Sequence, residues 1–146
     1  MTAHLLDDPK PTVLDGLTFA SARDQAQALA DGRVTALDLL EHSLARIERF
    51  DRHINAVVIR DDDRARAAAR IADAALARGE RRPLLGVPIT VKESFNVAGL
   101  VTSSGNPAYA DNRASGDSLA VAALREAGAV IIGKTNVPLG LADLQC

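Results

Sequence analysis

The stretch Gly128-Ala129-Val130-Ile131-Ile132-Gly133-Lys134-Thr135 decides how this sequence folds, because it admits two incompatible structures. Letter for letter it satisfies the P-loop pattern G-x-x-x-x-G-K-[ST], in which a flexible loop after a strand wraps a phosphate. Here the order is reversed, since a helix is predicted before the stretch and residues 129–132 are themselves typical of a buried strand. An extended strand cannot curl into an anion nest. We therefore expect a helix-to-strand connection, with nucleotide binding at residues 128–135 as the alternative.

Helical and strand-like segments alternate along the rest of the chain. Ser21 with Asp24, and Thr35 with Asp38, resemble capping boxes at the starts of two helices. The other predicted elements are helices at 64–78 and 118–127 (the latter capped by Asp117), strands at 56–59, 84–91 and 129–132, and an irregular loop over 93–116. This order predicts an α/β fold whose mixed β-sheet core is covered by helices on both faces.

The composition is that of a globular protein without an obvious nucleic-acid surface. The chain has 146 residues, is 47% hydrophobic and 25% charged, and carries a net charge of -2. The only cysteine is Cys146, which excludes a disulfide within the chain and favours a cytoplasmic protein. The start of the chain lacks the pattern of a signal peptide, and no apolar run has the length of a membrane span.

Lys92 is the strongest candidate for chemistry. It is one of only three lysines, and it follows the predicted strand 84–91 at the mouth of the long loop. Sites in open α/β sheets collect at the carboxyl ends of strands. A lysine buried at such a place loses solvation of its charged form, so its pKa falls and the neutral amine can act as a general base. The alternative is a solvated lysine that pairs with Glu93.

Other candidate groups give weaker signals. Ser103-Ser104-Gly105 resembles a nucleophile turn, but the G-x-S-x-G frame is missing and a turn-forming role is preferred. His4, His42 and His53 do not have the spacing of metal ligands. We therefore expect neither a metal nor a catalytic thiol at Cys146.

Several separate blocks of the chain resemble the amidase-signature family in their order and spacing. They are residues 31–36, Gly86-Val87-Pro88-Ile89-Thr90-Val91-Lys92-Glu93, Ala98-Gly99, Thr102-Ser103-Ser104-Gly105, and residues 127–138 (Ala-Gly-Ala-Val-Ile-Ile-Gly-Lys-Thr-Asn-Val-Pro). The resemblance covers nearly the whole chain from about Leu17 onward. It implies that residues 1–16 are an N-terminal arm and that residues 17–146 are the N-terminal portion of a single amidase-signature domain, truncated at its C-terminus.

The resemblance implies amide hydrolysis through a Ser–cis-Ser–Lys triad without metal or cofactor. One serine attacks the carbonyl, a second serine on a cis peptide bond relays the proton, and a neutral lysine receives it. By similarity that lysine is Lys92, and Leu141 is similar to a residue that lines the acyl side of the pocket. The family's Gly/Ser-rich block, which holds both serines and the oxyanion donors, follows the position of Cys146, so the chain alone is expected to be inactive. Glu93 stands where the family often has Asp.

The expected partners of the protein follow from the resemblance and from the composition. A small-molecule amide is expected as substrate, without nucleic acid or membrane, and a homo-oligomer is left open. The alternative to an enzyme is a truncated, non-catalytic remnant that associates with a partner through an exposed sheet edge and apolar helix surface.

Overall fold

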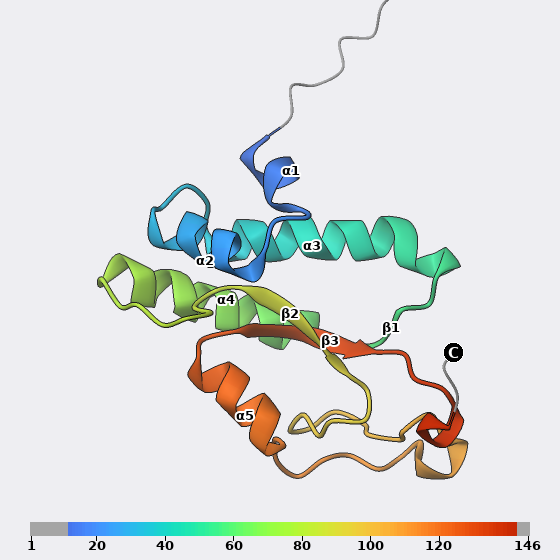
Figure 1. Cartoon of the computed structure of the whole chain (residues 1–146). Coiled ribbons are helices and arrows are strands. Elements are labelled where there is room, and N and C mark those ends of the chain that lie inside the picture. The colour runs from blue at the N-terminus through green and yellow to red at the C-terminus, as the bar shows by residue number, and fades with distance from the viewer. Residues whose placement is uncertain (1–11, 143–146) are drawn as a thin grey trace, which may run out of the picture.

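A three-stranded sheet lies at the centre of the computed structural model, which describes residues 12–142 (Figure 1). Its strands β1 (Val57–Arg60), β2 (Pro88–Lys92) and β3 (Val130–Thr135) have the order β1-β3-β2. Strand β3 pairs antiparallel with β1 and parallel with β2. The sheet is therefore mixed, as predicted, and its central strand is the apolar stretch of the P-loop-like motif.

Five α-helices and three short 3₁₀ turns surround this sheet within the described residues. They are α1 (Val13–Leu17), α2 (Ala22–Ala30), α3 (Ala36–Phe50), α4 (Asp62–Ala77), α5 (Leu119–Glu126), η1 (Asp51–His53), η2 (Pro107–Tyr109) and η3 (Leu139–Leu141). Among residues 12–142, none of these helices has both the length and the apolar character that crossing a membrane requires.

The helices cover both faces of the sheet, which confirms the predicted architecture (Figure 1). On one face, buried side chains of α2, α3 and α4 pack against Val130 and Ile132 of β3. On the other face, Val121 of α5 packs with Ile131 of β3 and Val91 of β2. Successive strand residues point to opposite faces, so the apolar run of β3 supplies both cores.

The predicted helix starts are confirmed in the first half of the chain and corrected in the second. The side chains of Ser21 and Thr35 each accept a hydrogen bond from the backbone of the third residue after them. Helix α5, in contrast, is capped by Ser118 and not by Asp117. The Asp117 carboxylate accepts a hydrogen bond from the backbone N–H of Ala98 and pairs with Arg125. It therefore connects the long loop to Arg125 in the last turn of α5 and does not cap the start of that helix.

The strand predicted at residues 84–91 begins later, at Pro88. Residues 83–86 form a turn in which Gly86 has a φ of 83°, and its N–H donates to the carbonyl of Gly128 at 3.0 Å. A Cβ at Gly86 would lie 2.8 Å from the Cβ of Ala36, so α3 leaves room only for glycine. The apolar side chains Leu85 and Val87 are buried because this turn packs into the core, and not because they belong to the strand.

Candidate functional site

Lys92 is the last residue of β2, at the strand end where it was predicted, but its side chain is exposed. Its neighbours Val91 and Glu93 are both buried and point to the opposite face of the strand. The burial that a neutral Lys92 requires is therefore not supplied by residues 12–142. The alternative pairing of Lys92 with Glu93 is also wrong, because Glu93 has a different partner.

Within residues 12–142 the buried lysine is Lys134, whose side chain has 0% exposure. Its Nζ donates hydrogen bonds to the carbonyl of Val101 and, at 2.8 Å, to Thr102 Oγ1. The same Nζ lies 3.8 Å from Glu93 Oε1, in an ion pair of which both members are buried. Burial lowers the pKa of Lys134, and the charge of Glu93 opposes that shift. Two hydrogen bonds and one ion pair thus hold this ammonium group inside the protein.

The two glycines of the P-loop-like motif have structural roles. A Cβ at Gly133 would lie 2.1 Å from the carbonyl oxygen of Ile59 in the neighbouring strand β1. A Cβ at Gly128 would lie 2.7 Å from the Cα of Leu85, and Gly128 ends α5 with a φ of 94°. Both positions require glycine for close backbone approach. Because Lys134 is also buried, the motif offers no phosphate cradle, and the structure weighs against the nucleotide-binding alternative.

Glu93 is the second functional candidate that sequence reasoning missed. Its side chain is 3% exposed, and its Oε1 accepts a hydrogen bond of 2.5 Å from the backbone N–H of Ser103. Its Oε2 is buried without a hydrogen-bond partner among residues 12–142. In the sequence, an acidic residue next to a strand-end lysine suggests that the two form a solvated pair. Only the position of Lys134 on the adjacent strand could have indicated that Glu93 is buried and paired with Lys134 instead.

The Ser103-Ser104-Gly105 segment forms a turn, as preferred from the sequence. Gly105 donates its N–H to Ser103 Oγ at 3.2 Å, and both Ser104 and Gly105 have positive φ angles. A Cβ at Gly105 would lie 2.5 Å from the carbonyl oxygen of Pro138, so this turn touches the segment that leads into η3.

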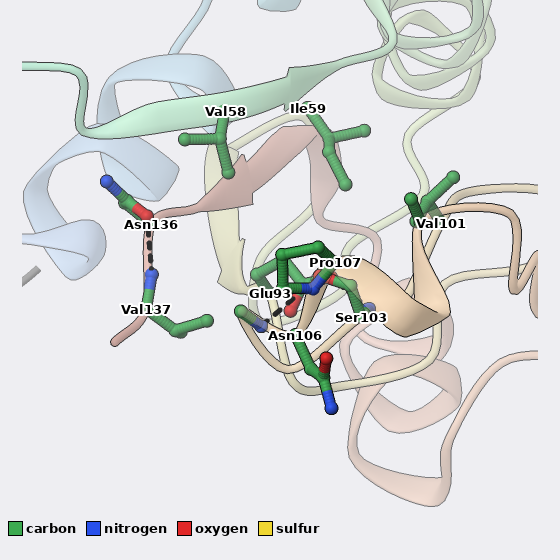
Figure 2. A pocket seen from close by; sticks show the side chains of 11 residues that line it. Val58, Ile59, Glu93, Val101, Ser103, Asn106, Pro107, Asn136 and Val137 are labelled. Carbon is green, nitrogen blue, oxygen red and sulfur yellow. Dashed lines mark hydrogen bonds between the residues drawn. The ribbon is translucent and has the colours of Figure 1, made fainter. Parts of the chain in front are cut away.

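A pocket of about 450 Å³ lies beside this turn. Figure 2 shows Val58 and Ile59 of β1 on one side of the pocket, facing Ser103, Pro107 and Glu93 on the other. The lining of the pocket also includes Asn136 and Val137, which follow β3. Neither Lys92 nor Leu141 belongs to the lining, so this pocket does not include the predicted catalytic lysine.

Leu141 lies in η3, with a side chain that is 42% exposed and a φ of 60°. His42 Nε2 lies 2.8 Å from Thr18 Oγ1, and within residues 12–142 no group of three His, Cys, Asp or Glu side chains is placed to hold a metal ion. His4 and Cys146 lie outside the described residues.

The chain is similar to proteins named as amidases and amidotransferase subunits. The family model named Amidase matches residues 38–146. AmiB2 of Mycobacterium tuberculosis (strain ATCC 25618 / H37Rv), a putative amidase by name, is 52% identical over 122 residues, which are 84% of this chain and 26% of that protein. A glutamyl-tRNA(Gln) amidotransferase subunit of Halorhodospira halophila is 41% identical over 110 residues, covering 75% of this chain and 23% of that protein.

The fold of the chain is also that of a solved peptide amidase. The native peptide amidase of Stenotrophomonas maltophilia superposes with a TM-score of 0.77 at 30% identity, over 83% of this chain and 25% of that one. The chain thus spans about a quarter of the length of the curated relatives and of the solved enzyme that it matches.

Proposed function

The chain belongs to the amidase-signature family, and from this premise we propose that the protein cleaves carboxamide C–N bonds with Lys92 as the lysine of a Ser–cis-Ser–Lys triad. The observation that carries the proposal is the position of Lys92. It ends a parallel strand, where α/β folds gather their catalytic groups, and its side chain is exposed. The next residue, Glu93, belongs to the buried ion pair. An exposed amine at such a place is free to meet catalytic partners.

The proposed chemistry needs Lys92 as a proton acceptor and then as a proton donor. A serine oxygen attacks the amide carbonyl while its proton passes through the second serine to the neutral Nζ of Lys92. The lysine then returns this proton to the departing nitrogen, which leaves an acyl-enzyme and releases ammonia or an amine. Water attacks the acyl-enzyme by the same route in reverse, which yields the carboxylic acid and restores both serines.

The two serines and the oxyanion donors are proposed to lie in sequence that, in the relatives, follows the segment matched by this chain. In that arrangement the additional sequence would also bury Lys92 and favour its neutral form. Residues 1–146 by themselves are therefore proposed to be inactive, because the members of a catalytic triad act as a unit. Leu141, on the exposed side of η3, is proposed to contact the acyl group of the substrate.

The domain bounds, the substrate class and the location are proposed from the family. We keep residues 17–146 as part of a single domain, with a small-molecule amide as substrate, a cytoplasmic location, and self-association still to be measured. Residues 1–16 are proposed as an arm, although Leu14 of α1 packs against the core and ties the end of that arm to it.

The experiment compares the complete gene product that carries this sequence with the 146-residue chain. Ammonia release is measured on a panel of aliphatic and aromatic primary amides. We expect turnover by the complete product, a loss of about 10³-fold or more in Lys92→Ala, and no turnover by the 146-residue chain. Lys92→Arg is the matched control for charge, because arginine keeps the positive charge but cannot become neutral, and it should be as inactive as Lys92→Ala. Full activity in either variant would remove Lys92 from the mechanism.

A partner-binding remnant is the second candidate, and exposed apolar side chains favour it. Val58 on the edge strand β1 and Leu139 in η3 are 40% and 65% exposed. Exposed strand edges and apolar side chains of this kind favour association with another chain, which removes them from water. Size-exclusion chromatography of the 146-residue chain separates the cases, since a monomer that stays monomeric at high concentration would count against this candidate.

A further inference from the structure

The buried pair Glu93–Lys134 has no part in the proton transfers proposed above. Glu93 follows directly after the strand-end residue Lys92, and Lys134 lies on the adjacent strand β3. Both side chains are buried, at 3% and 0% exposure. In the parallel register Val91 is opposite Lys134, and Lys92 is opposite Thr135. The two charges therefore meet on one face of β2, while Lys92 points to the other.

The pair holds three consecutive loop residues by directional hydrogen bonds. Lys134 Nζ donates to the carbonyl of Val101 and to Thr102 Oγ1. Glu93 Oε1 accepts from the N–H of Ser103. These partners are 10 and 32–33 residues away in sequence, so the contacts connect β2 and β3 to the middle of the long loop. A point charge alone would not fix a loop in this way, but a set of aimed donors and acceptors does.

The loop residues that follow the three held residues contact η3 and the residue before it. After the three held residues, the carbonyl of Ser104 accepts a hydrogen bond of 2.8 Å from the N–H of Gly140. Gly105 packs so tightly against Pro138 that no side chain fits between them. Ser104 and Leu141 are both non-glycine residues with left-handed backbones, at φ of 51° and 60°. Such conformations persist where the surrounding structure determines them, and they concentrate at functional sites.

Stability alone does not account for this arrangement. Removing two charges from water usually offsets the attraction between them, and a buried ion pair can often be replaced by apolar groups without loss. Here the pair is not even fully satisfied, because Glu93 Oε2 has no hydrogen-bond partner among residues 12–142. A half-satisfied buried polar network is less favourable than an apolar core. What the pair supplies is the fixed placement of residues 101–105.

From these contacts we infer that Glu93 and Lys134 are positioning residues that set the location of Lys92 at the end of β2 relative to Leu141 on η3, through the turn at 101–105. The catalytic half of this inference rests on the proposed function, since it assumes that Lys92 reacts and that Leu141 meets the acyl group. The structural half, the coupling from the ion pair to η3, stands independently. Neither residue touches the reacting atoms in this account.

Hydrogen exchange on the 146-residue chain tests the coupling. Glu93→Gln and the neutral double variant Glu93→Gln/Lys134→Met are compared with wild type, and Glu126→Gln, an exposed change on α5, is the matched control. The Ser103 and Gly140 amides should exchange at least tenfold faster in the double variant, while core amides of α3 and the melting temperature stay near the wild-type values. Unchanged exchange at Ser103 and Gly140 would overturn the inference, and so would equal acceleration throughout α3.

Kinetics on the complete gene product test the positioning role. A merely structural pair would lower the folded fraction and leave kcat per folded enzyme unchanged. A positioning pair lowers kcat at least tenfold in the double variant with an intact fold, and Glu93→Asp recovers more of kcat than Glu93→Gln. An unchanged kcat in the double variant would refute the role. Absence of amide hydrolysis in wild type would instead contradict the proposed function, and the exchange data would then decide the coupling alone.

Discussion

Replacing Gly133 by alanine tests why this glycine is present. A Cβ at this position would lie 2.1 Å from the carbonyl oxygen of Ile59, almost 1 Å inside the closest approach that real Cβ atoms show. The obstacle is backbone of the paired strand β1 and cannot rotate away, so β1 and β3 must separate where Arg60 pairs with Gly133. Overpacking of this kind costs about 3 kcal/mol, and alanine recovers about 0.5–1 kcal/mol as a better strand residue. We expect a net loss of about 2 kcal/mol.

Urea unfolding of the 146-residue chain measures this loss. With a slope of about 2 kcal/mol per molar urea, the midpoint should fall by about 1 M. Gly16→Ala is the matched control, because Gly16 lies in α1 with no atom within 4 Å of its added Cβ, and its stability should be unchanged or slightly higher. A Gly133→Ala variant within 0.5 kcal/mol of wild type would refute the account of β3 as a strand that needs glycine for close packing.

Four further outcomes follow from particular contacts. Reductive methylation of the native 146-residue chain should modify the exposed Lys92 readily and leave the buried Lys134 unmodified, as read by mass spectrometry; equal rates would contradict the burial of Lys134. Because burial lowers the pKa of Lys134, the unfolded chain keeps that proton to higher pH, toward 10.5. In urea unfolding, the free energy of unfolding of wild type should therefore rise relative to that of Lys134→Met as the pH goes from 7 to 10. A difference that stays constant with pH would contradict the lowered pKa of Lys134. Asp73→Ala should lose about 1–3 kcal/mol, because the Asp73 carboxylate on α4 accepts from the N–H groups of Ala36 and Leu37 at the start of α3; a loss below 0.5 kcal/mol would show that Thr35 suffices. ATP with magnesium should not raise the melting temperature, whereas a clear rise would revive nucleotide binding at residues 128–135.

The local parts of the fold could be predicted from the sequence because their signals act over a few residues. Ser21 and Thr35 cap the helices that begin directly after them by accepting the N–H of the third residue ahead, and the apolar run of β3 is buried on both faces. The prediction failed where a distant segment decides. Leu84 is bent into a turn because α3 and Gly128 pack against Gly86. The Asp117 carboxylate bonds to the N–H of Ala98 and pairs with Arg125 in the last turn of α5, instead of capping the start of that helix. Spacing along the chain carries no signal for such contacts.

The same limit explains why spacing could not tell which of the two lysines is buried. A lysine after an apolar strand and a lysine inside a P-loop-like motif look similar in sequence, and only the tertiary structure tells which one meets water. Lys134 is buried because residues 101–102, more than 30 positions earlier, close over it. Lys92 is exposed because the strand alternation turns it away from that loop. Family resemblance assigned the role to Lys92, while the residues alone left the alternatives open.

The contrast between the two lysines locates what the proposed chemistry still requires. Residues 12–142 bury Lys134 and hold it with two hydrogen bonds and an ion pair, which keeps it from reaching a ligand. They give Lys92 a fixed place at the end of β2 but leave its side chain exposed, without the burial that favours the neutral form of a lysine amine. A general base at this position therefore depends on atoms that cover Lys92 from the face opposite Glu93. Those atoms must exclude water without supplying a carboxylate, since an acidic neighbour would stabilise the ammonium form and prevent the reaction.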